Sequence, residues 1–158
     1  MRNMPYLPLL ASLLTLSLAS LTPGLAGAEG TTGPETREGD GRSIQGRWRV
    51  VGFNREGREF SEDQLQRLAA SVRFTGENVT QAASGDKGED GSFTLDGDRK
   101  PKRLTITPKD GGHPQTMIYE LDGDRLRLAS RIGDGGNPPS DFEPRRGRVV
   151  MTLERQKE

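Results

Sequence analysis

Apolar and polar residues alternate along most of the chain from residue 44 onward. Clear examples are SVRF at 71–74, SFTL at 92–95, RLTI at 103–106 and RVVMTLE at 148–154. Alternation with a period of two places apolar side chains on one face of an extended strand and polar side chains on the other. The pattern therefore predicts roughly eight half-buried strands.

The stretch TMIYELDGDRLRLAS predicts a β-hairpin. A two-residue turn at Asp122-Gly123 would set Tyr119 opposite Leu126 and would gather the long apolar side chains on one face. A slip of one residue would scatter them over both faces, so the register is well specified.

A second copy of LDGDR, at 95–99, does not fit a tight turn, because such a turn would set Phe93 against Lys100. Pairing Leu95 with Leu104 and Phe93 with Ile106 needs a longer loop through the following proline. We therefore interpret the two copies as similar turn chemistry and not as a repeated unit.

One segment, FSEDQLQRLAAS at 60–71, departs from the alternation. Ser61 and Gln64 have the spacing of a helical capping box, and Phe60 and Leu65 that of a hydrophobic staple. We expect a helix of about two turns that lies against the sheet.

Short antiparallel strands with one apolar face remove their exposed edges most simply by closing into a barrel. We expect the inner face to carry Trp48, Val50, Val72, Phe74, Phe93, Leu95, Leu104, Ile106, Met117, Tyr119, Leu121, Leu126, Leu128, Val149, Met151 and Leu153. These side chains are mostly large, which favours a filled barrel over a hollow one.

Three regions follow from composition. Residues 1–28 have an N-terminal arginine, a short apolar run and a small-x-small pattern at Ala26–Ala28, which predicts a cleaved signal peptide and a periplasmic or secreted protein. Residues 29–43 hold no large apolar side chain, which is typical of a flexible linker. Residues 44–156 have the size of a single barrel domain.

The only tryptophan stands in Gly46-Arg47-Trp48, which resembles the G-x-W motif that opens lipocalin-like barrels. In those barrels a basic residue from the last strand commonly lies across the indole. The resemblance implies that Arg148 or Arg155 takes this place here by a cation–π contact, and the sequence leaves both open.

The order of segments resembles, over nearly the whole domain, a family of small exported lipocalin-like domains that is abundant in planctomycete bacteria and has no known function. The matching segments are IQGRWRVVGF, REGREFSEDQL, VRFTGENVT, SFTLDGDRKPKRLTITP, MIYELDGDRLRL and NPPSDFEP. The resemblance implies an all-β, antiparallel lipocalin-like barrel with a short helix after the first strand. It implies no catalytic residue.

Candidate chemistry is sparse. The chain has no cysteine and a single histidine, His113, so a transition-metal site would depend almost entirely on carboxylates. The segment Asp86–Gly91 lacks two positions of a calcium loop, and we interpret it as a turn. Lys and Arg balance Asp and Glu at 23 each, which argues against a nucleic-acid binder. We expect no metal, no cofactor and no enzyme activity.

Two functions remain. In the first, loops that include Phe142, Arg145 and Arg146 contact an envelope protein or a polysaccharide. In the second, the barrel carries a small apolar or amphipathic ligand. We expect a monomer without a membrane span after signal cleavage. The residues that line the ligand, or fill the core, are Trp48, Phe74, Phe93, Met117, Tyr119, Leu128 and Met151.

Overall fold

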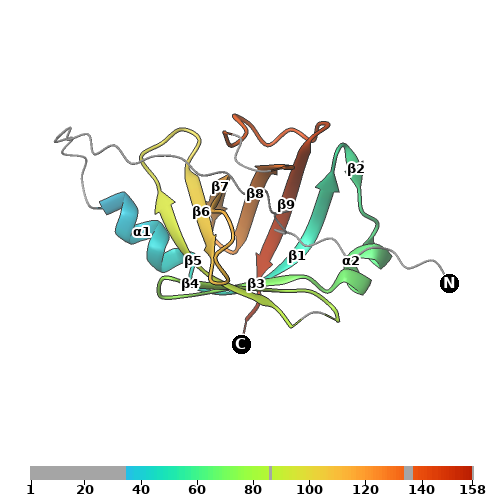
Figure 1. The fold of residues 1–158 in the computed structure, drawn as a ribbon, viewed down its shortest axis with the longest axis horizontal. Helices are drawn as coiled ribbons and strands as arrows, with labels where there is room; N and C mark the ends of the chain where they lie inside the picture. The colour runs from blue at the N-terminus through green and yellow to red at the C-terminus, as the bar shows by residue number, and fades with distance from the viewer. Residues whose placement is uncertain (1–34, 86, 134–136, 158) are drawn as a thin grey trace.

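The chain folds as a closed antiparallel barrel of eight strands with two short helices (Figure 1). The computed structural model describes residues 35–157, apart from residues 86 and 134–136. The barrel strands are β1 (Gly46–Arg55), β3 (Ser71–Thr75), β4 (Asn78–Ala82), β5 (Glu89–Asp96), β6 (Arg103–Pro108), β7 (Gln115–Asp122), β8 (Arg125–Arg131) and β9 (Arg148–Arg155). They pair in chain order, and β9 pairs with β1 to close the barrel, which confirms the predicted fold.

The short strand β2 (Arg58–Glu59) forms a hairpin with the last residues of β1, outside the barrel circuit. After it comes helix α2 (Glu62–Leu68), as predicted. The capping box is present, because the Ser61 N–H donates to Gln64 Oε1 at 2.9 Å and Ser61 Oγ accepts from the Gln64 N–H at 3.4 Å. Leu65 and Leu68 pack against the barrel core.

The predicted β7–β8 hairpin forms, but its turn is one residue later than predicted. Tyr119 pairs with Leu128, and the two turn residues are Gly123 and Asp124. Gly123 has a φ of +56°, and a glycine is favoured at the first central position of a tight hairpin turn. Moving the turn by one residue shifts the pairing by two, so every side chain keeps its predicted face.

The β5–β6 pairing confirms the longer loop that the second LDGDR copy requires. Leu95 pairs with Leu104 and Phe93 pairs with Ile106. The LDGDR copy at 95–99 therefore contains residues typical of turns but does not form a two-residue turn.

Helix α1 (Glu35–Ser43) corrects part of the predicted linker at 29–43. The helix has no apolar stripe, and a polar contact connects it to the barrel instead. The Asp40 carboxylate accepts hydrogen bonds from Lys102 Nζ at 2.7 Å and from the Tyr119 hydroxyl at 2.8 Å. Composition alone cannot show such a contact between distant residues. Residues 29–34 and the predicted signal peptide at 1–28 lie outside the described residues.

The predicted inner set forms the core. All sixteen side chains belong to one apolar cluster or pack against it, and Leu95, Leu121 and Val149 are its half-buried members. The cluster also holds Ile44, Phe53, Ala70 and Val79, which the alternation does not identify as inward.

A β-bulge explains the inward position of Phe53. The pairing of β1 with β9 shifts between Val50 and Gly52, which inserts one extra residue in β1. After a bulge the alternation changes phase, so Phe53 and Arg55 face inward. Gly52 suits this place, because a Cβ there would lie 3.3 Å from Cβ of Thr152.

Candidate functional site

The two ends of the barrel differ in whether their buried polar side-chain atoms have hydrogen-bond partners. At the first, which we call the sealed end, β1 begins and β9 ends, and residues 43–48 lie against Arg155. Trp48 is fully buried there, and its Nε1 donates a hydrogen bond to the Ile44 carbonyl at 2.7 Å. The guanidinium of Arg155 lies 4.3 Å from the centre of the indole ring. Of the two candidates, Arg155 is therefore the residue that lies across the tryptophan.

Arg155 is fully engaged at this end. Its Nη1 donates to the Gln45 carbonyl at 2.5 Å, its Nη2 donates to the Ser43 carbonyl, and its Nε donates to Asp124 at 2.9 Å. Gly46 allows this approach, because a Cβ at Gly46 would lie 3.2 Å from Arg155 Nη1. The φ of Gly46 is +112°, a conformation that favours glycine. Both fixed positions of the G-x-W pattern therefore lie against Arg155: Gly46 leaves room for its guanidinium, and the Trp48 ring packs against it.

The Asp40 contact adds to the sealed end. Burial of the Tyr119 ring, together with its hydrogen bond to the Asp40 carboxylate, raises the pKa of the Tyr119 hydroxyl well above its ordinary value. The hydroxyl therefore stays protonated and donates to Asp40, while Lys102 balances the carboxylate charge.

The seven side chains predicted to line a ligand or fill the core lie inside the barrel, each with no more than 8% of its surface exposed. Phe74 and Phe93 pack edge to face with ring centres 4.8 Å apart. Of the seven, only Met151 borders a pocket of about 40 Å³, whose lining is Val50, Ala70, Ser71, Val72, Gln81, Ala82, Ala83, Gly88, Glu89 and Met151. Such a volume holds water molecules and no lipid chain.

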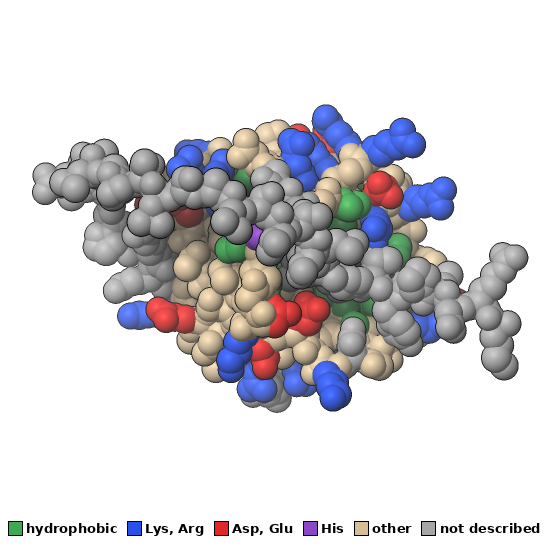
Figure 2. Space-filling model, viewed as in Figure 1, with side chains coloured by type: hydrophobic (Ala, Val, Ile, Leu, Met, Phe, Trp, Pro, Cys, Tyr) green, Lys and Arg blue, Asp and Glu red, His purple; other side chains and the backbone are tan. Residues whose placement is uncertain are grey.

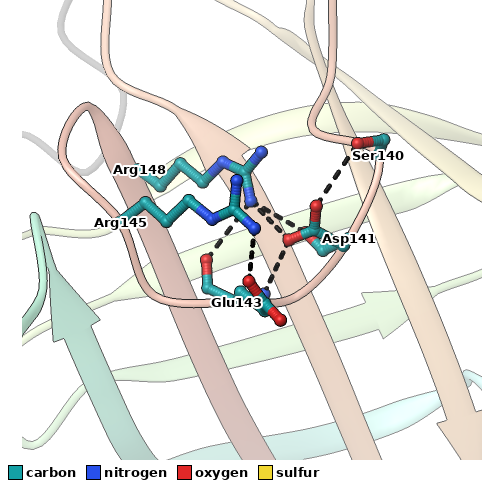
Figure 3. A network of polar contacts seen from close by, with 5 residues as sticks. All are labelled: Ser140, Asp141, Glu143, Arg145 and Arg148. Atoms are coloured by element: carbon teal, nitrogen blue, oxygen red, sulfur yellow. Dashed lines mark hydrogen bonds and ion pairs between the residues drawn. The ribbon is translucent and has the colours of Figure 1, made fainter.

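The opposite end, which we call the loop end, is where β1 finishes at Arg55, β6 at Pro108 and β8 at Arg131. Part of the connection from β8 to β9 is held by a polar network (Figure 3). Arg148 donates to Asp141 Oδ1 at 2.6 Å, and the Glu143 N–H donates to the same oxygen at 2.9 Å. The hydrogen bond from Arg148 lowers the pKa of the Asp141 carboxyl below its ordinary value.

The three predicted loop contacts have different surroundings. Phe142 packs on the outer face of the barrel against Ile118, Ala129 and Val150, with the Arg127 guanidinium 4.7 Å from its ring centre. Arg145 forms an ion pair with Glu143. Arg146 is exposed and is the one that lines an open hollow.

This hollow, which we call the arginine hollow, has a volume of about 570 Å³ and is lined by Arg55, Glu56, Arg58, Phe60 and Arg146. Lys and Arg side chains gather in the part of Figure 2 where Figure 1 draws β2 and the start of β9. Arg55 is the last inward residue of β1, opposite Val149, and its Nη1 is buried without a hydrogen-bond partner. Arg55 is not among the residues predicted from the sequence, although the out-of-phase Phe53 indicates the bulge that turns Arg55 inward.

Within the described part of the chain, no three His, Asp or Glu side chains group as metal ligands. His113 is exposed in the connection between β6 and β7. Residues 89–91 of the Asp86–Gly91 segment belong to β5, so the predicted turn is wrong there, and Asp86 itself lies outside the described residues. No helix among the described residues is long and apolar enough to cross a membrane.

Comparison with known proteins finds no family model, curated protein or solved structure that matches this chain.

Proposed function

We propose that the chain is an exported, non-catalytic interaction domain that contacts a protein or a polysaccharide of the cell envelope through its loop end. The observation that carries this proposal is the difference between the interior and the loop end. The interior is occupied by the protein's own apolar side chains. The loop end presents an open hollow with arginines that pair with no described acid.

The proposal is tested by site-specific cross-linking. The chain has no cysteine, so one introduced cysteine carries a photo-activated cross-linker to a single place. Asn137→Cys places it on an exposed residue between β8 and β9, near the loop end. Glu77→Cys, the matched control, places it on an exposed residue between β3 and β4, at the sealed end.

The proposal predicts cross-links to envelope material from Asn137→Cys and none from Glu77→Cys. Equal cross-linking from both positions, or cross-linking from Glu77→Cys alone, would contradict it.

Adding an apolar fluorescent probe to the native protein distinguishes the carrier function from the interaction function. In a barrel that opens to a ligand, the probe would change Trp48 emission saturably at micromolar concentration. The filled interior predicts blue-shifted Trp48 emission that the probe leaves unchanged. A saturable change would favour the carrier function.

A further inference from the structure

We propose that the arginine hollow binds an anionic group, a carboxylate or a sulfate, of an acidic polysaccharide. The inference rests on the proposed function and names the partner chemistry of the same loop end.

The hollow lies where two parts of the chain meet. Arg55, Glu56, Arg58 and Phe60 come from the β1–β2 hairpin and the residue after it, and Arg146 comes from the segment just before β9. The Glu56 N–H donates to the Arg148 carbonyl at 2.8 Å, which ties the hairpin to the start of β9. The arginines are therefore brought together by the backbone and not by contacts with each other.

The charges in the hollow are unbalanced. Three arginines face one glutamate. Two other arginines at the barrel ends do have an acid beside them, since Arg148 pairs with Asp141 and Arg155 pairs with Asp124. Within the described residues, no hydrogen bond or ion pair is formed by the side chains of Arg58 and Arg146.

Arg55 gives the clearest sign of an absent partner. Its Nη1 is buried and unpartnered, and a buried donor without an acceptor is costly unless a bound group satisfies it. Arg55 lies on the inner face of β1 beyond the bulge, so its guanidinium borders the hollow from the barrel side. Arg55 is one of the residues that line the hollow, so an anion bound there would lie beside this side chain.

An anion with several planar or tetrahedral oxygens suits this arrangement. Guanidinium groups bind carboxylate and sulfate oxygens through paired, charge-assisted hydrogen bonds. The volume of about 570 Å³ lies in the range of small-molecule sites and accommodates a sugar unit as well as its charged group.

Two lining residues favour a sugar. Phe60 is half-buried and offers an apolar ring, against which the C–H face of a sugar ring can pack. Glu56 offers a carboxylate that accepts from sugar hydroxyl groups. The chain as a whole has zero net charge, so long-range attraction to any polyanion is weak and the local geometry has to select the ligand.

The test measures binding to the full chain by calorimetry, with a galacturonate tetramer as the probe and its methyl ester as the neutral control. A sulfated galactose tetramer distinguishes sulfate from carboxylate. Arg58→Gln and Arg146→Gln remove exposed arginines of the hollow. Arg73→Gln removes an exposed arginine on β3 as the matched control.

We expect one of the acidic tetramers to bind and the methyl ester to bind at least tenfold more weakly. We expect Arg58→Gln and Arg146→Gln each to weaken that binding by about tenfold, which corresponds to about 1.4 kcal/mol, because each removes a charge-assisted hydrogen bond. Arg73→Gln should leave the affinity unchanged, and binding should weaken as salt is raised.

The inference is overturned if the methyl ester binds as tightly as the acid, if the two hollow variants bind normally, or if neither acid binds at millimolar concentration. It is also overturned if a glutamate hexapeptide binds at least tenfold more tightly than either tetramer, which would make the partner an acidic protein segment. In each case, cross-linking from Asn137→Cys decides separately whether the proposed function stands.

Discussion

The sealed end and the loop end of the barrel treat buried polar groups in opposite ways. At the sealed end, the polar atoms of Trp48 and Arg155 have partners at hydrogen-bond distance. At the loop end lie three buried side-chain atoms without a partner among the described residues: Asn54 Oδ1, Arg55 Nη1 and Gln115 Oε1.

This difference affects how much each end contributes to the stability of the fold. A buried polar group that has a partner adds modestly to stability, whereas one without a partner costs free energy. We therefore expect the sealed end to contribute more to the stability of the fold, and we propose that the loop end is the part that binds another molecule.

The largest expected effect comes from Trp48→Ala. Removing this fully buried ring takes away core packing and the surface on which Arg155 lies, so it should lower the free energy of unfolding by about 3–5 kcal/mol. Arg58→Ala, an exposed change at the loop end, should stay within about 0.5 kcal/mol of the parent. Urea unfolding measures both. A small effect of Trp48→Ala would show that the sealed end does not stabilise the barrel.

A pair of glycines sharpens the comparison. Gly46 at the sealed end and Gly57 at the loop end both have positive φ, but only at Gly46 would a Cβ meet a neighbour, Arg155 Nη1 at 3.2 Å. Gly46→Ala should lower the free energy of unfolding by about 2–3 kcal/mol. Gly57→Ala should lower it by about 1 kcal/mol, the backbone cost alone. Equal losses in urea unfolding would contradict the role assigned to Arg155.

Tyr119 provides a pH test of the sealed end. Its hydroxyl has a raised pKa in the folded protein, so the folded state favours the protonated form. This contribution is fully present below the ordinary pKa of about 10 and is lost as pH rises above that value. The unfolding free energy of the parent should therefore fall above about pH 10 more steeply than that of Tyr119→Phe. Parallel pH profiles for the two proteins would mean that burial and the hydrogen bond to Asp40 do not raise the pKa of Tyr119 in the folded protein.

Arg55→Met should cause no loss of stability. It replaces a half-buried side chain, whose Nη1 is buried without a hydrogen-bond partner, with an apolar side chain of similar length, so the free energy of unfolding should stay the same or rise by up to about 1 kcal/mol. A loss above about 2 kcal/mol, measured by urea unfolding, would show that Arg55 has a structural partner in the folded protein.

Much of the barrel could be predicted from the alternation, because the inward residues recur at every second position and so lie on the same face of each strand. Tyr119 and Leu128 kept their predicted face although the turn between them moved by one residue. The outer cluster around Phe142 escaped prediction, since Ile118, Ala129 and Val150 occupy positions that alternation assigns to solvent.

The candidate site was harder to predict than the fold. A single extra residue in β1 turns Arg55 inward, and strict alternation counted from Trp48 and Val50 gives the wrong face. Helix α1 depends on the pairing of Asp40 with Lys102 and Tyr119, which lie far away in the sequence. Both features arise from register and long-range contacts, which local composition does not record.

The most direct test of the division between the two ends measures stability and envelope cross-linking on the same two variants. Each variant carries the Asn137→Cys cross-linker and is studied at a temperature where it is folded. We expect Gly46→Ala to lower the free energy of unfolding by about 2–3 kcal/mol and to keep the cross-links. Arg146→Gln should keep the stability and lose the cross-links. The reverse pattern, or loss of both properties in either variant, would contradict the assignment of stability to the sealed end and of binding to the loop end.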